Sequence, residues 1–92
     1  MGKKNKRSTR TSEFDLLLDI IKRAREDANL SQREVAKRLE FHPTVFGKIE
    51  RGERSIDVVE FVALSRAIGA DPLVLLGSYL VAEQKARIEK VL

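Results

Sequence analysis

Apolar side chains recur at steps of three and four residues along most of the chain, which is the spacing of one face of an α-helix. The first stripe predicts a helix over residues 13–28, and the next predicts a short helix over residues 32–39. Further helices are expected to begin at Pro43, after Asp57 and after Asp71. No run of alternating β-branched residues interrupts this series, so the pattern predicts an all-α fold of five helices.

Capping residues indicate where several of these helices begin and end. Ser12 is the expected N-cap of the first helix, and Asn29 suits its C-terminus because Asn tolerates left-handed backbone. Ser31 and Asp57 are each followed three positions later by Glu, which is the signature of a capping box. Pro43 fits a first helical position, where its missing N–H would have no partner in any case.

The chain divides into an arm, a helical domain and an extension. Residues 1–12 contain no apolar residue after the first Met and predict a flexible basic arm. Residues 13–77 are expected to form the domain, and residues 78–92 a C-terminal helical extension. Gly77 and Ser78 either break or weaken the last helix.

Composition narrows the class of function. Apolar residues make up 42% and charged residues 35%, which is typical of a globular domain. With no Cys and one His, the chain offers no disulfide, thiolate metal site, multi-His metal site or Cys nucleophile, and a reducing cytoplasm suits it. Apolar stretches such as residues 73–76 are far shorter than a membrane span. We expect no enzyme, no cofactor, no metal and no membrane partner.

Positive charge is concentrated in two segments. The chain has a net charge of +4, but residues 1–12 carry five basic and no acidic side chains. Residues 31–55 carry six basic and four acidic side chains, and both flanking segments are acidic. This asymmetry favours a polyanionic partner, although a basic tail is also a common solubilising end. The basic side chains of the arm are Lys3, Lys4, Lys6, Arg7 and Arg10.

Two short helices separated by three residues form the most specific pattern. They are expected over residues 32–39 and 43–50, with the small Ala36 where they cross closely. Phe46 and Ile49 are placed to anchor the second helix in the core. A helix-turn-helix needs this arrangement, because its second helix must be held rigidly while it enters a major groove.

At these residues the sequence resembles the phage repressor and Cro-type helix-turn-helix family, also called the xenobiotic-response-element type. Three segments carry the resemblance without a gap: LSQREVA at residues 30–36, IERGER at 49–54 and LSRAIGADPL at 64–73. The resemblance covers about residues 14–77. It implies a five-helix, lambda-repressor-like bundle that binds double-stranded DNA and regulates transcription.

The resemblance also implies roles for individual residues. The expected base contacts are His42, Pro43, Thr44, Gly47 and Lys48. The expected phosphate contacts are Gln32, Arg33, Lys37, Arg51 and Arg54. Arg25 and Glu50 match a structural pair that holds the third helix against the first. The basic arm would add affinity through counterion release, with Arg7 and Arg10 suited to a narrow minor groove.

Two features depart from the family pattern. Glu40 stands where the turn usually carries Gly, and a non-Gly residue at positive φ costs about 1 kcal/mol, so we expect a turn of different shape. The third helix is poor in hydrogen-bonding side chains, since it carries Pro43, Val45 and Gly47. Base readout is therefore expected to use few contacts together with DNA shape.

The extension predicts a second partner, another copy of the chain. Its apolar positions would need cover, and the expected dimer contacts are Tyr79, Leu80, Ile88, Val91 and Leu92. A two-fold dimer implies a pseudo-palindromic site. A cytoplasmic, nucleoid-associated regulator of a phage or prophage, a restriction-modification controller and an antitoxin-like protein all fit. Two alternatives are a protein-interaction module with weak or lost DNA binding, and non-specific binding of nucleic acid by the arm.

Overall fold

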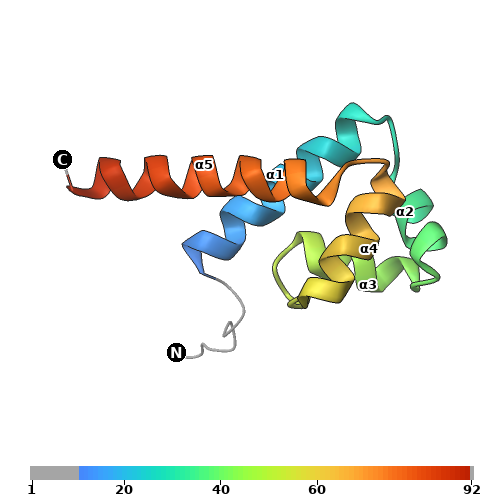
Figure 1. The fold of residues 1–92 in the computed structure, drawn as a ribbon. Helices are drawn as coiled ribbons and strands as arrows, with labels where there is room; N and C mark the ends of the chain where they lie inside the picture. Colours follow the sequence, from blue (N-terminus) through green and yellow to red (C-terminus); the bar gives the residue numbers. More distant parts are fainter. Residues whose placement is uncertain (1–10, 92) are drawn as a thin grey trace, which may run out of the picture.

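The computed structural model describes residues 11–91, and the expected arm residues Lys3, Lys4, Lys6, Arg7 and Arg10 lie outside them, as does Leu92. The described chain forms α1 (Ser12–Asp27), α2 (Gln32–Leu39), α3 (Pro43–Glu50), α4 (Val58–Ile68) and α5 (Pro72–Val91). No strand occurs within residues 11–91, and the predicted all-α, five-helix fold is confirmed. In Figure 1, α2, α3 and α4 cluster at one end, while α5 crosses α1 and extends its C-terminal half away from that cluster.

The core is aliphatic with two phenylalanines, and it fixes α3 in place. Phe46 and Ile49 of α3 are fully buried, as is Ala36 of α2 at the crossing between the two helices. A small side chain there lets the two backbones approach closely. The buried hydrophobic residues are Leu18, Ile21, Val35, Ala36, Phe46, Ile49, Phe61, Leu64, Ile68 and Leu75. The polar side of α3 is therefore left facing outward.

The helix caps follow the sequence with one correction. The N-cap of α1 is Thr11, whose Oγ1 accepts the backbone N–H of Phe14 at 3.0 Å, and Ser12 is the first helical residue. Both predicted capping boxes are present, at Ser31 before α2 and at Asp57 before α4. Thr11 and Ser12 are adjacent and both carry a hydroxyl that can cap α1, so the expected cap at Ser12 is wrong by one position.

The turn between α2 and α3 does not have the different shape expected from its missing glycine. Glu40 adopts the left-handed conformation itself, with φ of 61°, and so does Asn29 after α1, with φ of 59°. The backbone N–H groups of Glu40 and Phe41 donate to Lys37 and Ala36, which satisfies the last carbonyls of α2. The strain of Glu40, about 1 kcal/mol for a non-Gly residue, is tolerated because the helices on both sides are held by the core.

The last helix runs without a break. α5 passes through Gly77 and Ser78 as one helix of 20 residues, so these residues do not interrupt it. Leu75 is its buried anchor, and the segment after Ser78 is a continuation of the same helix. Among the described helices, none combines the length and the apolar character that a membrane crossing requires.

Candidate nucleic-acid interface

The first turn of α3 faces outward. His42, Pro43, Thr44 and Lys48 are exposed, whereas Gly47 is buried beside the side chains of Arg51 and Gln32. Four of the five residues expected at bases therefore lie on an accessible surface. Gly47 instead provides room: a Cβ there would lie 3.1 Å from Nη1 of Arg51 and 3.5 Å from Oε1 of Gln32.

His42 is the N-cap of α3, and its contacts define the hydrogen-bonding groups that remain. Its Nδ1 accepts the backbone N–H of Thr44 at 3.2 Å and lies 2.8 Å from Oγ1 of Thr44. Because an amide N–H only donates, the bond from the Thr44 backbone needs an unprotonated Nδ1 that accepts it. The ring proton then lies on Nε2, where it is a donor suited to a base or phosphate oxygen.

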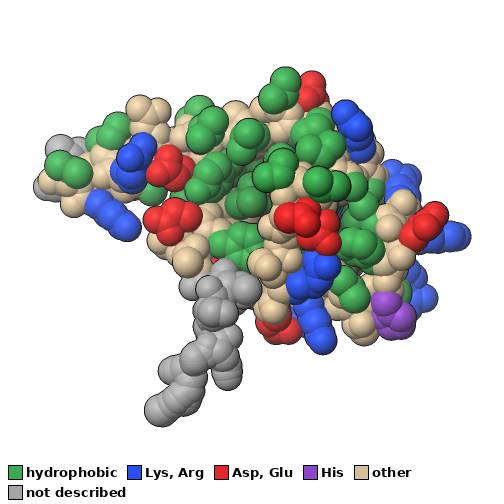
Figure 2. Space-filling view, turned by 60° about the horizontal axis from the view of Figure 1, so that its bottom comes forward, with side chains coloured by type: hydrophobic (Ala, Val, Ile, Leu, Met, Phe, Trp, Pro, Cys, Tyr) green, Lys and Arg blue, Asp and Glu red, His purple; other side chains and the backbone are tan. Residues whose placement is uncertain are grey.

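An open hollow separates α2 from the beginning of α3, and basic side chains border it. Its lining residues are Arg33, Lys37, Phe41, His42, Pro43 and Thr44. Among residues 11–91, Arg33 and Lys37 form no ion pair, so their charge is available to a bound anion. In Figure 2, Lys and Arg side chains gather around the single histidine at one end of the molecule. Three expected base contacts and two expected phosphate contacts thus line the same hollow, whereas Lys48, Gln32, Arg51 and Arg54 are not among its lining residues.

Arg25 and Glu50 form the pair that the resemblance implies, and a third residue joins it. Glu50 Oε2 accepts Nε of Arg25 at 2.7 Å, and Oε1 accepts Nη2 at 3.1 Å, with the Glu50 side chain only 3% exposed. This hydrogen bond raises the pKa of Arg25. Gln32 Nε2 donates to the same Oε1 at 2.7 Å. Nothing in the sequence indicates that the expected phosphate ligand Gln32 contacts this pair.

The two arginines of the loop after α3 have acidic partners that sequence reasoning missed. Arg51 Nε lies 3.0 Å from Oε2 of Glu53, and Arg54 Nη2 lies 2.8 Å from Oε2 of Glu60. The hydrogen bond from Arg54 lowers the pKa of Glu60. The Arg54 guanidinium also lies over the ring of Phe41, 5.6 Å from its centroid. The loop is therefore less positive than a count of its arginines suggests.

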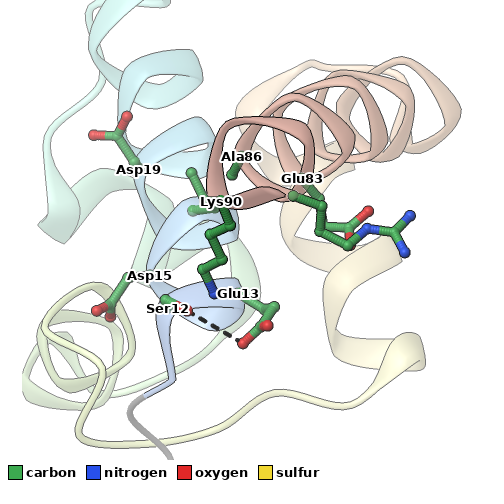
Figure 3. Close-up of a pocket in the computed structure, with 9 residues that line it drawn as sticks. Ser12, Glu13, Asp15, Asp19, Glu83, Ala86 and Lys90 are labelled. Atoms are coloured by element: carbon green, nitrogen blue, oxygen red, sulfur yellow. Dashed lines mark hydrogen bonds and ion pairs between the residues drawn. The ribbon is translucent and has the colours of Figure 1, made fainter. Parts of the chain in front are cut away.

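The crevice between α1 and α5 is lined by more acidic than basic side chains. It is lined by Ser12, Glu13, Asp15, Leu16, Asp19, Glu83, Ala86, Arg87 and Lys90. In Figure 3, Glu13 lies on the side of α1 nearer α5, whereas the carboxylates of Asp15 and Asp19 point away from α5. Arg87 is paired with Glu83 at 2.8 Å. Four carboxylates make this face unfavourable for a phosphate backbone, and no cluster of metal-ligating side chains is found within residues 11–91.

Of the expected dimer residues that lie within residues 11–91, all but Tyr79 are exposed. Leu80 and Ile88 are each 53% exposed and Val91 is 85% exposed. Tyr79 is half-buried beside an apolar groove between α1, α4 and α5, and burial raises the pKa of its phenol. The sequence analysis did not assign further apolar residues that are also exposed, on α4 and α5: Val58, Val59, Leu73, Val74, Leu76 and Val81.

Comparisons with known proteins agree with this geometry. The family profile of a helix-turn-helix domain matches residues 17–76. A solved structure of an XRE-family like protein from Pseudomonas syringae pv. tomato is 37% identical, with a TM-score of 0.74 over 77% of this chain and 87% of that chain. The clp gene regulator ClgR from Corynebacterium glutamicum shares the fold at 20% identity, with a TM-score of 0.67 over 88% of this chain and 90% of that chain. No curated protein matches the sequence.

Proposed function

The chain belongs to the XRE-type helix-turn-helix family of DNA-binding transcriptional regulators, and we propose that it is a homodimeric, repressor-like protein that recognises a specific double-stranded site. In this proposal α3 enters the major groove while α2 contacts the sugar-phosphate backbone. The protein acts at promoters in the cytoplasm of a bacterial cell, on genes of bacterial, prophage or phage origin. Base and phosphate roles stay as assigned from the family pattern, except that Gly47 contributes space rather than a contact.

One observation carries the proposal: the exposed first turn of α3 and two basic side chains of α2 border the same hollow. Thr44 and Lys48 supply groups that bond base edges, while Arg33 and Lys37 supply positive charge for phosphates. Because α3 is anchored by buried Phe46, these groups are held in a fixed arrangement. A rigid helix with a donor-bearing outer side is what readout of a major groove requires.

The dimer is proposed from the apolar surface of α5. Leu80, Ile88 and Val91 lie exposed along a helix whose opposite side packs on α1. Isolated exposed apolar residues are ordinary, but a row of them on one helix is typical of a protein interface. Two copies joined there present two α3 helices, and two-fold symmetry then selects a pseudo-palindromic site with half-sites about one helical turn apart.

Selection of bound duplexes from a random-sequence pool tests specificity, symmetry and spacing together. We expect enrichment of one pseudo-palindromic sequence, with binding that weakens steeply as salt concentration rises. Removal of residues 1–10 should reduce affinity while the site preference remains. Enrichment of no sequence, together with loss of all binding in the truncated protein, would instead support non-specific binding by the arm.

A second candidate is a protein-interaction module on the same scaffold with weak or lost DNA binding. The pairing of Arg51 with Glu53 and of Arg54 with Glu60 favours it, because these pairs reduce the positive charge beside α3. Under this alternative, gel-shift assays at low salt would show no complex with any duplex. A shift with a defined sequence decides in favour of the regulator.

A further inference from the structure

The Glu50 carboxylate connects three helices through hydrogen bonds. Arg25 reaches it from the end of α1, Gln32 is the first residue of α2, and Glu50 itself is the last residue of α3. Arg25 also donates from Nη1 to the backbone carbonyl of Leu30, at 2.8 Å, which fixes the α1–α2 connection. The same buried carboxylate thus contacts Gln32 and joins α3 to α1.

The charge on Glu50 also sets the orientation of the Gln32 amide. A carboxylate offers only acceptors, so the amide must turn its nitrogen inward, and the opposite orientation would place two oxygens against each other. Oε1 of Gln32 consequently points toward Gly47, where it lies 3.5 Å from the position that a Cβ would take. One N–H of Nε2 is used by Glu50, and no other described residue accepts the second.

We propose that Glu50 is a positioning residue for DNA binding, which holds the Gln32 amide so that its second N–H is presented to a phosphate of the duplex. This inference rests on the proposed function. Arg25 makes the arrangement compatible with a nearby phosphate, because it neutralises the carboxylate through two hydrogen bonds. Glu50 therefore acts on DNA through Gln32, in addition to joining α3 to α1.

Substitution Glu50→Gln tests this role because it nearly preserves size and removes the charge. The carboxylate accepts three hydrogen bonds, two from Arg25 and one from Gln32, whereas an amide oxygen at position 50 has only two lone pairs. If Arg25 uses both of them, Gln32 loses its partner and its fixed orientation. We expect the affinity of Glu50→Gln for a selected duplex to fall about tenfold, as for loss of one hydrogen bond to a charged group. An unrelated duplex should lose affinity by the same factor, because a phosphate contact carries no sequence information.

A double-mutant cycle separates positioning from mere structural support. Affinities are measured for the wild type, Gln32→Ala, Glu50→Gln and the double variant, at a temperature where circular dichroism shows each to be folded. We expect the double variant to bind no more weakly than Gln32→Ala. Losses that multiply to about a hundredfold would overturn the inference, since independent sites add in free energy. Wild-type affinity of Gln32→Ala would also overturn it while leaving the proposed function intact.

Two further variants keep the test decisive. Leu64→Ala removes a buried side chain of α4 but leaves the bond between Glu50 and Gln32, so we expect a lower melting temperature and near wild-type affinity while the protein is folded. Glu50→Asp replaces Glu50→Gln if the latter does not fold, because it keeps the charge but withdraws the carboxylate from Gln32. A wild-type protein that binds no duplex would overturn the proposed function itself.

Discussion

α3 and α5 bury their apolar side chains to very different extents. α3 has eight residues, and its large apolar residues Phe46 and Ile49 are fully buried, which leaves polar groups outside. α5 has 20 residues but a single buried one, Leu75, and a row of exposed apolar side chains. The short helix is held rigidly and is suited to reading a polar ligand. The long helix is incompletely covered by its own chain and is suited to an apolar partner.

The largest effect is expected from removing the anchor of α3. Phe46→Ala should reduce the free energy of unfolding by about 4 kcal/mol, because it leaves a cavity at a fully buried site. Urea denaturation followed by circular dichroism measures this loss. Leu80→Asn on the exposed side of α5 is the control and should change monomer stability little. Comparable losses in both variants would contradict the contrast between the helices.

The exposed side of α5 is tested by placing charge on it. The double substitution Leu80→Asp and Ile88→Asp should weaken dimerisation by about two orders of magnitude, equivalent to about 3 kcal/mol, since two carboxylates would be desolvated at the interface. Sedimentation at a series of concentrations measures the change. Ser78→Asp on the same helix is the matched control, because Ser78 is not among the apolar positions. A dimer unaffected by the double substitution would exclude this part of α5 as the interface.

The outer side of α3 is tested at Lys48. Lys48→Ala should cost about 2 kcal/mol at one base position of the selected site and leave unrelated duplexes nearly unaffected. Lys85→Ala on α5 removes the same charge from an exposed position away from α3 and should bind as the wild type does. Titrations with a series of single-base variants of the site provide the measurement. If both substitutions weaken all duplexes equally, Lys48 acts only through its charge.

The smallest effect concerns the turn that connects α2 to α3. Glu40→Gly should raise the free energy of unfolding by up to about 1 kcal/mol, because glycine adopts the left-handed conformation without steric strain. The gain is reduced by the greater entropy of glycine in the unfolded chain. Thermal denaturation measures it, and Asn29→Gly is a comparison at a residue type that already tolerates positive φ. A clear loss of stability in Glu40→Gly would show that its side chain makes a compensating contribution.

Local signals in the sequence predicted most of the fold. The capping boxes at Ser31 and Asp57, and the proline at the start of α3, are each defined within four residues, and all are present in the structure. The continuity of α5 through Gly77 was not determined locally, because packing of that helix on α1 outweighs a single unfavourable residue. Similarly, the N-cap of α1 was expected at Ser12, but the neighbouring hydroxyl residue Thr11 occupies it.

The candidate site was less accessible to sequence reasoning, because its contacts join residues that are far apart in the chain. Gln32 and Glu50 are 18 positions apart, and nothing in either segment shows that they share a hydrogen bond. The pairing of Arg54 with Glu60 was also hidden, since Glu60 was already explained by its capping box. These pairings change which cations are available to DNA.

The sequence by itself determined the helices, the capping boxes of α2 and α4 and the type of residue at each outward position, because helix periodicity and capping depend on neighbours within a turn. Only the tertiary structure decided which polar groups on those positions have partners. It buried Gly47 beside Arg51, placed Gln32 on Glu50 and left Arg33 and Lys37 beside the exposed turn of α3. The physical reason is that hydrogen bonds and ion pairs need about 3 Å between donor and acceptor atoms, here on side chains of different helices. Packing of the core sets those distances.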